Sequence, residues 1–304
     1  MRSQRPDTVR EPFLRENARV LVVAPCGPVP EEPFRKGLDV LRGWGLEVCL
    51  SPGLWNRQGY LAGPDSERLE HLVRALRDEE ASAVWMARGG YGATRILRGL
   101  EDALPESPPA LIGFSDGTAL HALFDSRGHS CVHGPVVTQL GRLTSESLRQ
   151  CKEFLFGIQT QWRSGPLESL NGIEAPSAGP TWGGNLSLLC ALTGTPWQRP
   201  VSNRIVFIED VGEPVYRIDR MLQQLRDSHA LDTAAAILFG SFSEADRDPE
   251  LHQLLRAFSN SLPCPVWSGI PVGHEADNWM VPIGRMSRIE SGHWWVTQGG
   301  TENP

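Results

Sequence analysis

The sequence Gly113-Phe114-Ser115-Asp116-Gly117 places a hydroxyl between two glycines in the pattern G-x-S-x-G. It follows the apolar run 109–112 and precedes residues 118–124, whose apolar positions have helical spacing. A strand is therefore expected to end in a sharp turn that carries Ser115, with a helix starting at once. Such a turn exposes the hydroxyl and directs a helix N-terminus at the atom it attacks. The pattern alone also fits an ordinary loop, because glycine and serine are common there.

A serine nucleophile needs a general base, and histidine suits this role because its pKa lies near neutral pH. Of the eight histidines, His274 is the preferred candidate, since it lies in the glycine- and proline-containing loop 270–278. His133, near the expected end of a strand, is the second choice. A surface or capping histidine is an equally good interpretation of His274 from its position alone.

The base in turn needs a carboxylate that orients it. Glu209 ends the apolar run 204–208, and the carboxyl end of a strand in an α/β protein faces the usual ligand crevice. The alternative is an acid that caps the following helix, and Asp210 or Glu213 suits that role better than Glu209.

An oxyanion hole requires backbone N–H groups near the nucleophile. The N–H of Asp116 follows Ser115 at the expected start of a helix. A second donor could come from Gly90 in the glycine-rich turn 88–92, where glycine lets the backbone approach a substrate closely. A phosphate cradle is less favoured, because neither G-x-G-x-x-G nor a P-loop occurs, and a plain left-handed turn is also possible.

A second glycine pair precedes another expected helix, in Trp182-Gly183-Gly184-Asn185. Trp182 could form an apolar wall of the cleft and Asn185 a polar clamp. An equally good interpretation is that Asn185 caps the helix and that the glycines allow close packing.

Composition limits the possible functions. The chain has 304 residues, 40% of them hydrophobic, which is enough for two domains with real cores. A net charge of -7 without a basic stripe argues against nucleic acid as a partner. The sequence has no run long enough to span a membrane and no secretory signal, so a cytoplasmic protein is expected. The six cysteines are expected to be reduced core thiols, and no residue cluster has metal-ligand spacing, so neither a metal nor a cofactor is predicted.

The order of the elements predicts an α/β fold. In the first half, strands alternate with helices, which indicates a parallel sheet covered on both faces. Residues 158–180 are rich in glycine, serine and proline and are predicted to be a linker or long crossing loop. The second half is predicted to be a smaller α+β domain with more antiparallel pairing, including a hairpin over 287–297. The predicted units are a domain over 14–157, the linker over 158–180 and a domain over 181–304.

Taken together, several segments resemble the LD-carboxypeptidase family, serine peptidase family S66. Their order and combination are far more specific than any one of them, and they extend over nearly the whole chain. The matching segments are 87–95, 112–120, 182–186, 207–210, 216–218 and 273–274.

The resemblance implies a triad of Ser115, Glu209 and His274, with oxyanion donors from the backbone of Gly90 and Asp116. It also implies a flavodoxin-like N-terminal domain, a smaller β-rich C-terminal domain, a homodimer and a bacterial cytoplasmic location. One branch of the family removes the terminal D-alanine from murein tetrapeptides, and another cleaves microcin C-type peptidyl or aminoacyl nucleotides.

An exopeptidase must also bind a free carboxylate, and Arg88 is the candidate clamp, with Tyr91 beside it as a further substrate-binding residue. Two other functions stay open at this point. An ordinary α/β-hydrolase esterase shares the G-x-S-x-G pattern, although no HGGG-type motif occurs. A non-enzymatic binding protein on the same scaffold would hold Ser115, Glu209 and His274 far apart.

Overall fold

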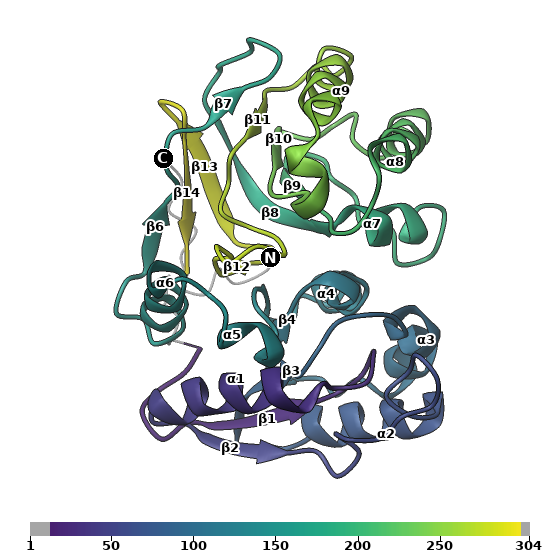
Figure 1. The fold of residues 1–304 in the computed structure, drawn as a ribbon, viewed down its shortest axis with the longest axis vertical. Helices are drawn as coiled ribbons and strands as arrows, with labels where there is room; N and C mark the ends of the chain where they lie inside the picture. Colours follow the sequence, from purple (N-terminus) through teal and green to yellow (C-terminus); the bar gives the residue numbers. More distant parts are fainter. Residues whose placement is uncertain (1–12, 299–304) are drawn as a thin grey trace, which may run out of the picture.

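A computed structural model describes residues 13–298, which form two sheets flanked by helices. Five strands of the first sheet run parallel in the spatial order 2-1-3-4-5, the order of flavodoxin-like folds. The predicted flavodoxin-like half is therefore confirmed. The six strands of this sheet, in spatial order, are β12 (Val281–Pro282), β5 (Cys131–His133), β4 (Ala110–Gly113), β3 (Ala81–Met86), β1 (Arg19–Val23) and β2 (Glu47–Leu50) (Figure 1).

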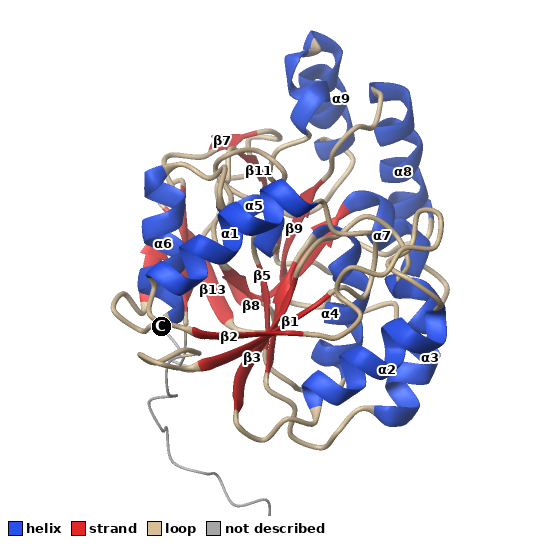
Figure 2. Ribbon diagram, turned by 60° about the horizontal axis from the view of Figure 1, so that its bottom comes forward, coloured by secondary structure: helices blue, strands red, loops and turns tan. Residues whose placement is uncertain are grey.

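Helices cover both faces of this sheet, because each presents an apolar stripe to it. Helices α1 (Glu31–Gly43) and α5 (Val137–Leu140) pack together on one face, and α2 (Asp65–Leu76) and α3 (Ala93–Ala103) lie on the other (Figure 2). Helix α1, for example, buries Phe34, Leu38 and Leu41.

Helix α4 (Thr118–Ser126) lies between the two halves of the molecule, where it contacts α3 on one side and α7 (Leu186–Leu192) on the other. This position explains why all of its residues from Thr118 to Phe124 are buried.

The second sheet is mixed. Its four central strands run parallel, and its outer strands pair antiparallel, as predicted for the hairpin over 287–297. The helices α7, α8 (Val215–Asp227) and α9 (Pro249–Ser259) lie along one side of it (Figure 1). In spatial order, the strands are β6 (Gln161–Arg163), β14 (His293–Thr297), β13 (Met286–Glu290), β8 (Ser177–Asn185), β9 (Ile205–Glu209), β10 (Ala236–Phe239), β11 (Val266–Ser268) and β7 (Glu168–Ser169).

The segment predicted as a linker, 158–180, contains β6, β7 and the start of β8. Strands β6 and β7 are short. The partner of β7, β11, lies about 100 residues further along the chain, and the partner of β6, β14, lies more than 130 residues further. No local pattern marks such strands, since the long-range pairing itself stabilises them. Helix α6 (Ser145–Leu155) precedes this segment. Thr144 is its N-cap, and the Thr144 hydroxyl accepts the Ser147 N–H.

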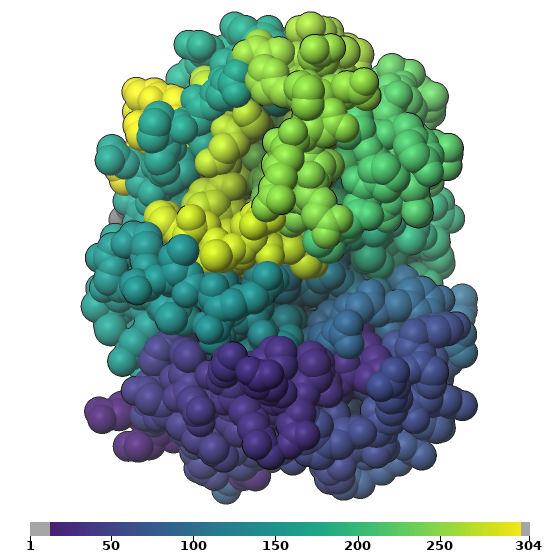
Figure 3. All heavy atoms as spheres, viewed as in Figure 1, coloured from purple at the N-terminus to yellow at the C-terminus, as the bar shows by residue number. Residues whose placement is uncertain are grey.

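A strand from the second half of the chain also joins the sheet of the first half. Strand β12, from the C-terminal half of the chain, extends the first sheet by pairing antiparallel with β5. In the space-filling view, yellow residues of the C-terminal part lie directly against teal residues of the first half (Figure 3). Between residues 13 and 298, no helix is both long and apolar enough to cross a membrane.

Candidate active site

Ser115 lies at the turn between β4 and α4, where residues Ser115–Gly117 form one short 3-10 turn. Its φ angle is 61°, in the left-handed region that side chains other than glycine rarely adopt. Such a conformation costs about 1–2 kcal/mol and persists mainly at functional sites. The observed backbone is a strained strand-to-helix turn, the geometry that presents a nucleophilic serine in other hydrolases.

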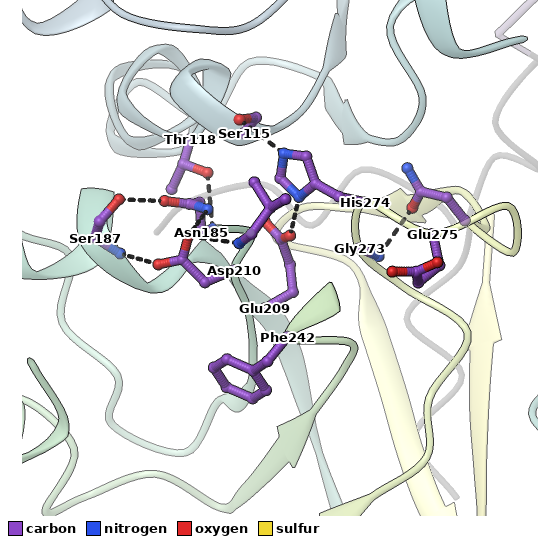
Figure 4. A network of polar contacts seen from close by, with 12 residues as sticks. Ser115, Thr118, Asn185, Ser187, Glu209, Asp210, Phe242, Gly273, His274 and Glu275 are labelled. Carbon is purple, nitrogen blue, oxygen red and sulfur yellow. Dashed lines mark hydrogen bonds and ion pairs between the residues drawn. The ribbon is translucent and has the colours of Figure 1, made fainter. Parts of the chain in front are cut away.

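His274 connects the Ser115 hydroxyl to Glu209 (Figure 4). Its Nε2 lies 3.0 Å from Ser115 Oγ, and its Nδ1 lies 2.7 Å from Glu209 Oε2. The carboxylate can only accept, so Nδ1 carries the ring proton and Nε2 is free to accept from the serine. The hydroxyl, the imidazole and the carboxylate are thus within hydrogen-bond distance of one another, in the order that acyl transfer requires. A binding protein with these residues far apart is excluded by this geometry.

Glu209 is fully buried at the end of β9, so its charge depends on protein partners. The Nδ1–H of His274 donates to one of the Glu209 carboxylate oxygens. The Phe114 ring lies 4.5 Å from the imidazole, centroid to centroid, and helps shield this contact from water. An apolar cover of this kind strengthens the interaction between the imidazole and the carboxylate.

The residues beside Glu209 form a second buried network. Asp210 Oδ1 accepts the Asn185 side-chain amide and the Val211 N–H, each at 2.8 Å, and Oδ2 accepts the Ser187 N–H at 2.9 Å. Burial and the neighbouring Glu209 raise the pKa of Asp210 to about 6. Asp210 therefore secures the start of α7 rather than α8, and it fixes the main chain next to Glu209.

The two predicted oxyanion donors come from turns that are joined to each other. The Asp116 carboxylate accepts the Ala93 N–H at 2.8 Å, which ties the end of the 88–92 turn to the serine turn. Burial raises the pKa of this carboxyl. A Cβ added to Gly89 would lie 3.2 Å from Ser115 Oγ, so the 88–92 turn lies directly against the hydroxyl. Within residues 13–298, the exposed Gly90 N–H makes no hydrogen bond.

Arg88 and Tyr91 flank these glycines at the surface. Arg88 is exposed, and its guanidinium donates to the Pro28 carbonyl at 2.5 Å. Tyr91 is 46% exposed and meets the exposed Tyr60 edge-on, at 5.7 Å between ring centroids. Both side chains are therefore exposed next to the glycine turn that lies against Ser115, and their role in substrate binding stays a prediction.

Trp182 and Asn185 do not have the exposed positions that a cleft wall and a polar clamp require. Trp182 is buried and lines a small cavity together with Leu189, Val206 and Leu225. Asn185 is buried, donates to Asp210 and accepts the Leu188 N–H at the start of α7. The capping interpretation of Asn185 is confirmed, and both side chains have interior packing roles.

His133, the second choice for the base, lies in the core. Its ring is fully buried between Phe114 and Phe207, and neither ring nitrogen has a partner among the described residues. Burial lowers the pKa of His133 well below the usual range. Among the described residues, Ser115 Oγ lies within hydrogen-bond distance of His274 Nε2 and not of His133.

The residues that bind the backbone of the His274 loop could not be predicted from the sequence. Gln139 and Arg142, from the segment that follows β5, donate to backbone carbonyls of this loop. No signal in the sequence connects them to His274, because more than 130 residues separate the two segments. No group of three or more metal-ligating side chains is found in the described part of the chain.

Gly273 is the residue whose replacement would disturb this loop most directly. Its φ angle is 140°, and a Cβ there would lie 2.1 Å from Ser241 Oγ. We expect Gly273→Ala to lower the free energy of unfolding by about 2 kcal/mol or more, from backbone strain and overpacking. Urea unfolding checks this value. Gly43→Ala at the end of α1, where a Cβ meets open space, is the matched control and should not destabilise. Equal stability of the two variants would contradict the strain argument.

The comparisons with known proteins agree with this geometry. Models of the LD-carboxypeptidase N-terminal and C-terminal domains match residues 20–134 and 178–289. The murein tetrapeptide carboxypeptidase of Pseudomonas aeruginosa is 33% identical over 90% of this chain and 94% of that protein. The microcin C7 self-immunity protein of Escherichia coli is 23% identical over 86% of each chain.

Similarity also extends to a solved structure. The crystal structure of muramoyltetrapeptide carboxypeptidase from Oxalobacter formigenes matches with a TM-score of 0.82 at 28% identity, over 93% of this chain and 100% of that chain. Both family models and relatives that match over nearly their full length indicate the same family. The chain belongs to the LD-carboxypeptidase family.

Proposed function

We propose that this protein is a serine carboxypeptidase that removes the terminal D-alanine from murein tetrapeptides during cell-wall recycling. The observation that carries the proposal is the chain of hydrogen bonds from Glu209 through His274 to Ser115. The names of the relatives from Pseudomonas aeruginosa and Oxalobacter formigenes support the substrate.

The reaction follows from the roles that the geometry allows. His274 Nε2 takes the proton of Ser115 as Oγ attacks the carbonyl that precedes D-alanine. The oxyanion forms against the N–H groups of Gly90 and Asp116. His274 then protonates the leaving amine, D-alanine departs, and an acyl-enzyme remains on Ser115. Water activated by His274 releases the shortened peptide. Glu209 holds the ring tautomer and stabilises the imidazolium throughout.

Arg88 is proposed to bind the free carboxylate of D-alanine. A charge-assisted hydrogen bond contributes about 1.5–3 kcal/mol, so Arg88→Ala should raise KM about tenfold or more. The turnover number kcat should change less, because the carboxylate is bound in both ground and transition states. Steady-state kinetics on the tetrapeptide measure both constants, and Arg149→Ala, a surface arginine of α6, is the control. An unchanged KM in Arg88→Ala would remove Arg88 from the carboxylate site.

The alternative substrate is a microcin C-type peptidyl or aminoacyl nucleotide, which the similarity to the microcin C7 self-immunity protein favours. This substrate would need an aromatic surface for the base. Trp182, the predicted apolar wall of the cleft, is buried in the structure.

A single set of incubations separates the two substrates. The enzyme is given a murein tetrapeptide ending in D-alanine, the same peptide ending in L-alanine, and an aminoacyl sulfamoyl adenosine. Cleavage of the first alone supports the proposal. Turnover of the adenosine compound without cleavage of the tetrapeptide would reverse the assignment, and activity on simple p-nitrophenyl esters alone would indicate an ordinary esterase.

Two further expectations stay proposals. We propose a homodimer, as the family resemblance implies, which sedimentation of the purified protein can measure. A cytoplasmic location is proposed because the substrate would be a recycled wall peptide inside the cell.

A further inference from the structure

Two buried amide side chains, Gln139 and Asn278, bind each other and the main chain around His274. Gln139 is 2% exposed and Asn278 is fully buried. Asn278 Nδ2 donates to Gln139 Oε1 at 2.9 Å. This bond leaves Gln139 Nε2 facing the carbonyls of Gly273 and Glu275, at 3.4 and 3.2 Å. On the other side, Asn278 Oδ1 accepts the Gly273 N–H at 3.2 Å.

The carbonyl of His274, which lies between those of Gly273 and Glu275, also accepts a hydrogen bond. Arg142 donates to the His274 carbonyl at 2.8 Å. Three consecutive carbonyls, those of residues 273 to 275, therefore accept hydrogen bonds from side chains of the segment 139–142. This segment follows β5, which pairs with β4, the strand that leads directly to Ser115. The base and the nucleophile are thus fixed to the same sheet, although they come from opposite halves of the chain.

We propose that Gln139, Asn278 and Arg142 are positioning residues that set the distance between His274 Nε2 and Ser115 Oγ. The proposal rests on the proposed function, in which that distance governs proton transfer. A misplacement of about 1 Å in a catalytic group lowers rates by about a hundredfold. The three side chains do not touch the reacting atoms and act only through the backbone of residues 273–275.

Gln139→Glu provides a test that depends on hydrogen-bond direction rather than on size. A carboxylic acid can donate its proton to a backbone carbonyl, as the amide does, whereas a carboxylate can only accept. At low pH, where residue 139 is protonated, the variant should therefore keep most of the kcat that wild type has at the same pH. As pH rises and the carboxylate forms beside two carbonyls, kcat should fall about ten- to a hundredfold below wild type, with little change in KM.

The matched control is Gln224→Glu. Gln224 also donates its amide to a backbone carbonyl, that of Cys190 at 3.2 Å, but it lies on α8, outside the His274 loop. Its kcat should follow the wild-type pH profile. If Gln139→Glu remains folded and shows the wild-type profile of kcat, the proposal is wrong.

Arg142 gives a second variant in case Gln139→Glu fails to fold. Arg142 is exposed, so Arg142→Ala leaves the core intact. We expect a loss of kcat that Arg142→Lys partly restores, because lysine can also donate to the His274 carbonyl. Equal kcat in wild type and Arg142→Ala would show that Arg142 does not position His274.

A spectroscopic readout separates this proposal from the substrate assignment. We expect the proton on His274 Nδ1, bonded to Glu209, to give a downfield imidazole resonance in the free protein. We expect this resonance to shift or broaden in Gln139→Glu at high pH and to stay in place in Gln224→Glu. An unchanged resonance contradicts the positioning role. Lack of tetrapeptide cleavage by wild type, with the resonance shifting as expected, contradicts only the proposed function.

Discussion

Replacement of Ser115 by alanine is expected to lower kcat/KM for release of D-alanine by on the order of 10⁴-fold or more. The hydroxyl 3.0 Å from His274 Nε2 is the only group in this arrangement that can form the acyl-enzyme. Stability should change little, because the alanine retains the backbone and Cβ of residue 115. An assay that oxidises the released D-alanine measures the rate, and circular dichroism confirms the fold.

Ser126→Ala is the matched control for this change. Ser126 lies at the other end of α4, where its hydroxyl donates to the Leu123 carbonyl. It has no contact with His274 or Glu209 among the described residues. The same chemical change there should leave kcat/KM within about twofold of wild type. A Ser115→Ala protein as active as Ser126→Ala would contradict the nucleophile assignment.

Replacement of Glu209 by glutamine is the second large effect. Glutamine has the same shape, but its amide can donate to His274 Nδ1 and so place the ring proton on Nε2, where it cannot accept from Ser115. We expect kcat to fall by on the order of 10⁴-fold, as for a triad left in the wrong tautomer. KM should change much less, since Glu209 is fully buried and cannot contact substrate.

A surface acid provides the comparison for Glu209→Gln. Glu101 pairs with Arg127 at 2.9 Å, and Glu101→Gln removes an exposed ion pair that contributes at most about 1 kcal/mol. Its kcat should match wild type. Near-wild-type kcat in Glu209→Gln would show that the carboxylate does not orient the base.

The serine turn could be predicted from the sequence because its signals are local. An apolar run, a G-x-S-x-G turn and a helical pattern follow one another within twenty residues, and the structure has β4, the turn and α4 in that order. Glu209 could be chosen for a similar reason, because it ends a strand whose residues Ile205–Glu209 are all buried. A general rule places such strand ends at the ligand crevice of α/β proteins.

Features that depend on distant pairing could not be predicted. Strands β6 and β7 exist because β14 and β11 lie beside them, and β12 joins a sheet built from the other half of the chain. The same holds for Gln139, which binds the His274 loop across more than 130 residues. The buried position of Trp182 could not be predicted either, because the glycines after it do not show which way its ring points.

We propose that Ser115 carries out the cleavage of a D-alanine-terminated wall peptide. Mass spectrometry of a murein tetrapeptide incubated with wild type and with Ser115→Ala tests it most directly. We expect wild type to convert the tetrapeptide to tripeptide and free D-alanine, and Ser115→Ala to leave it intact. Conversion by Ser115→Ala at the wild-type rate, or an intact tetrapeptide in both incubations, would contradict the claim.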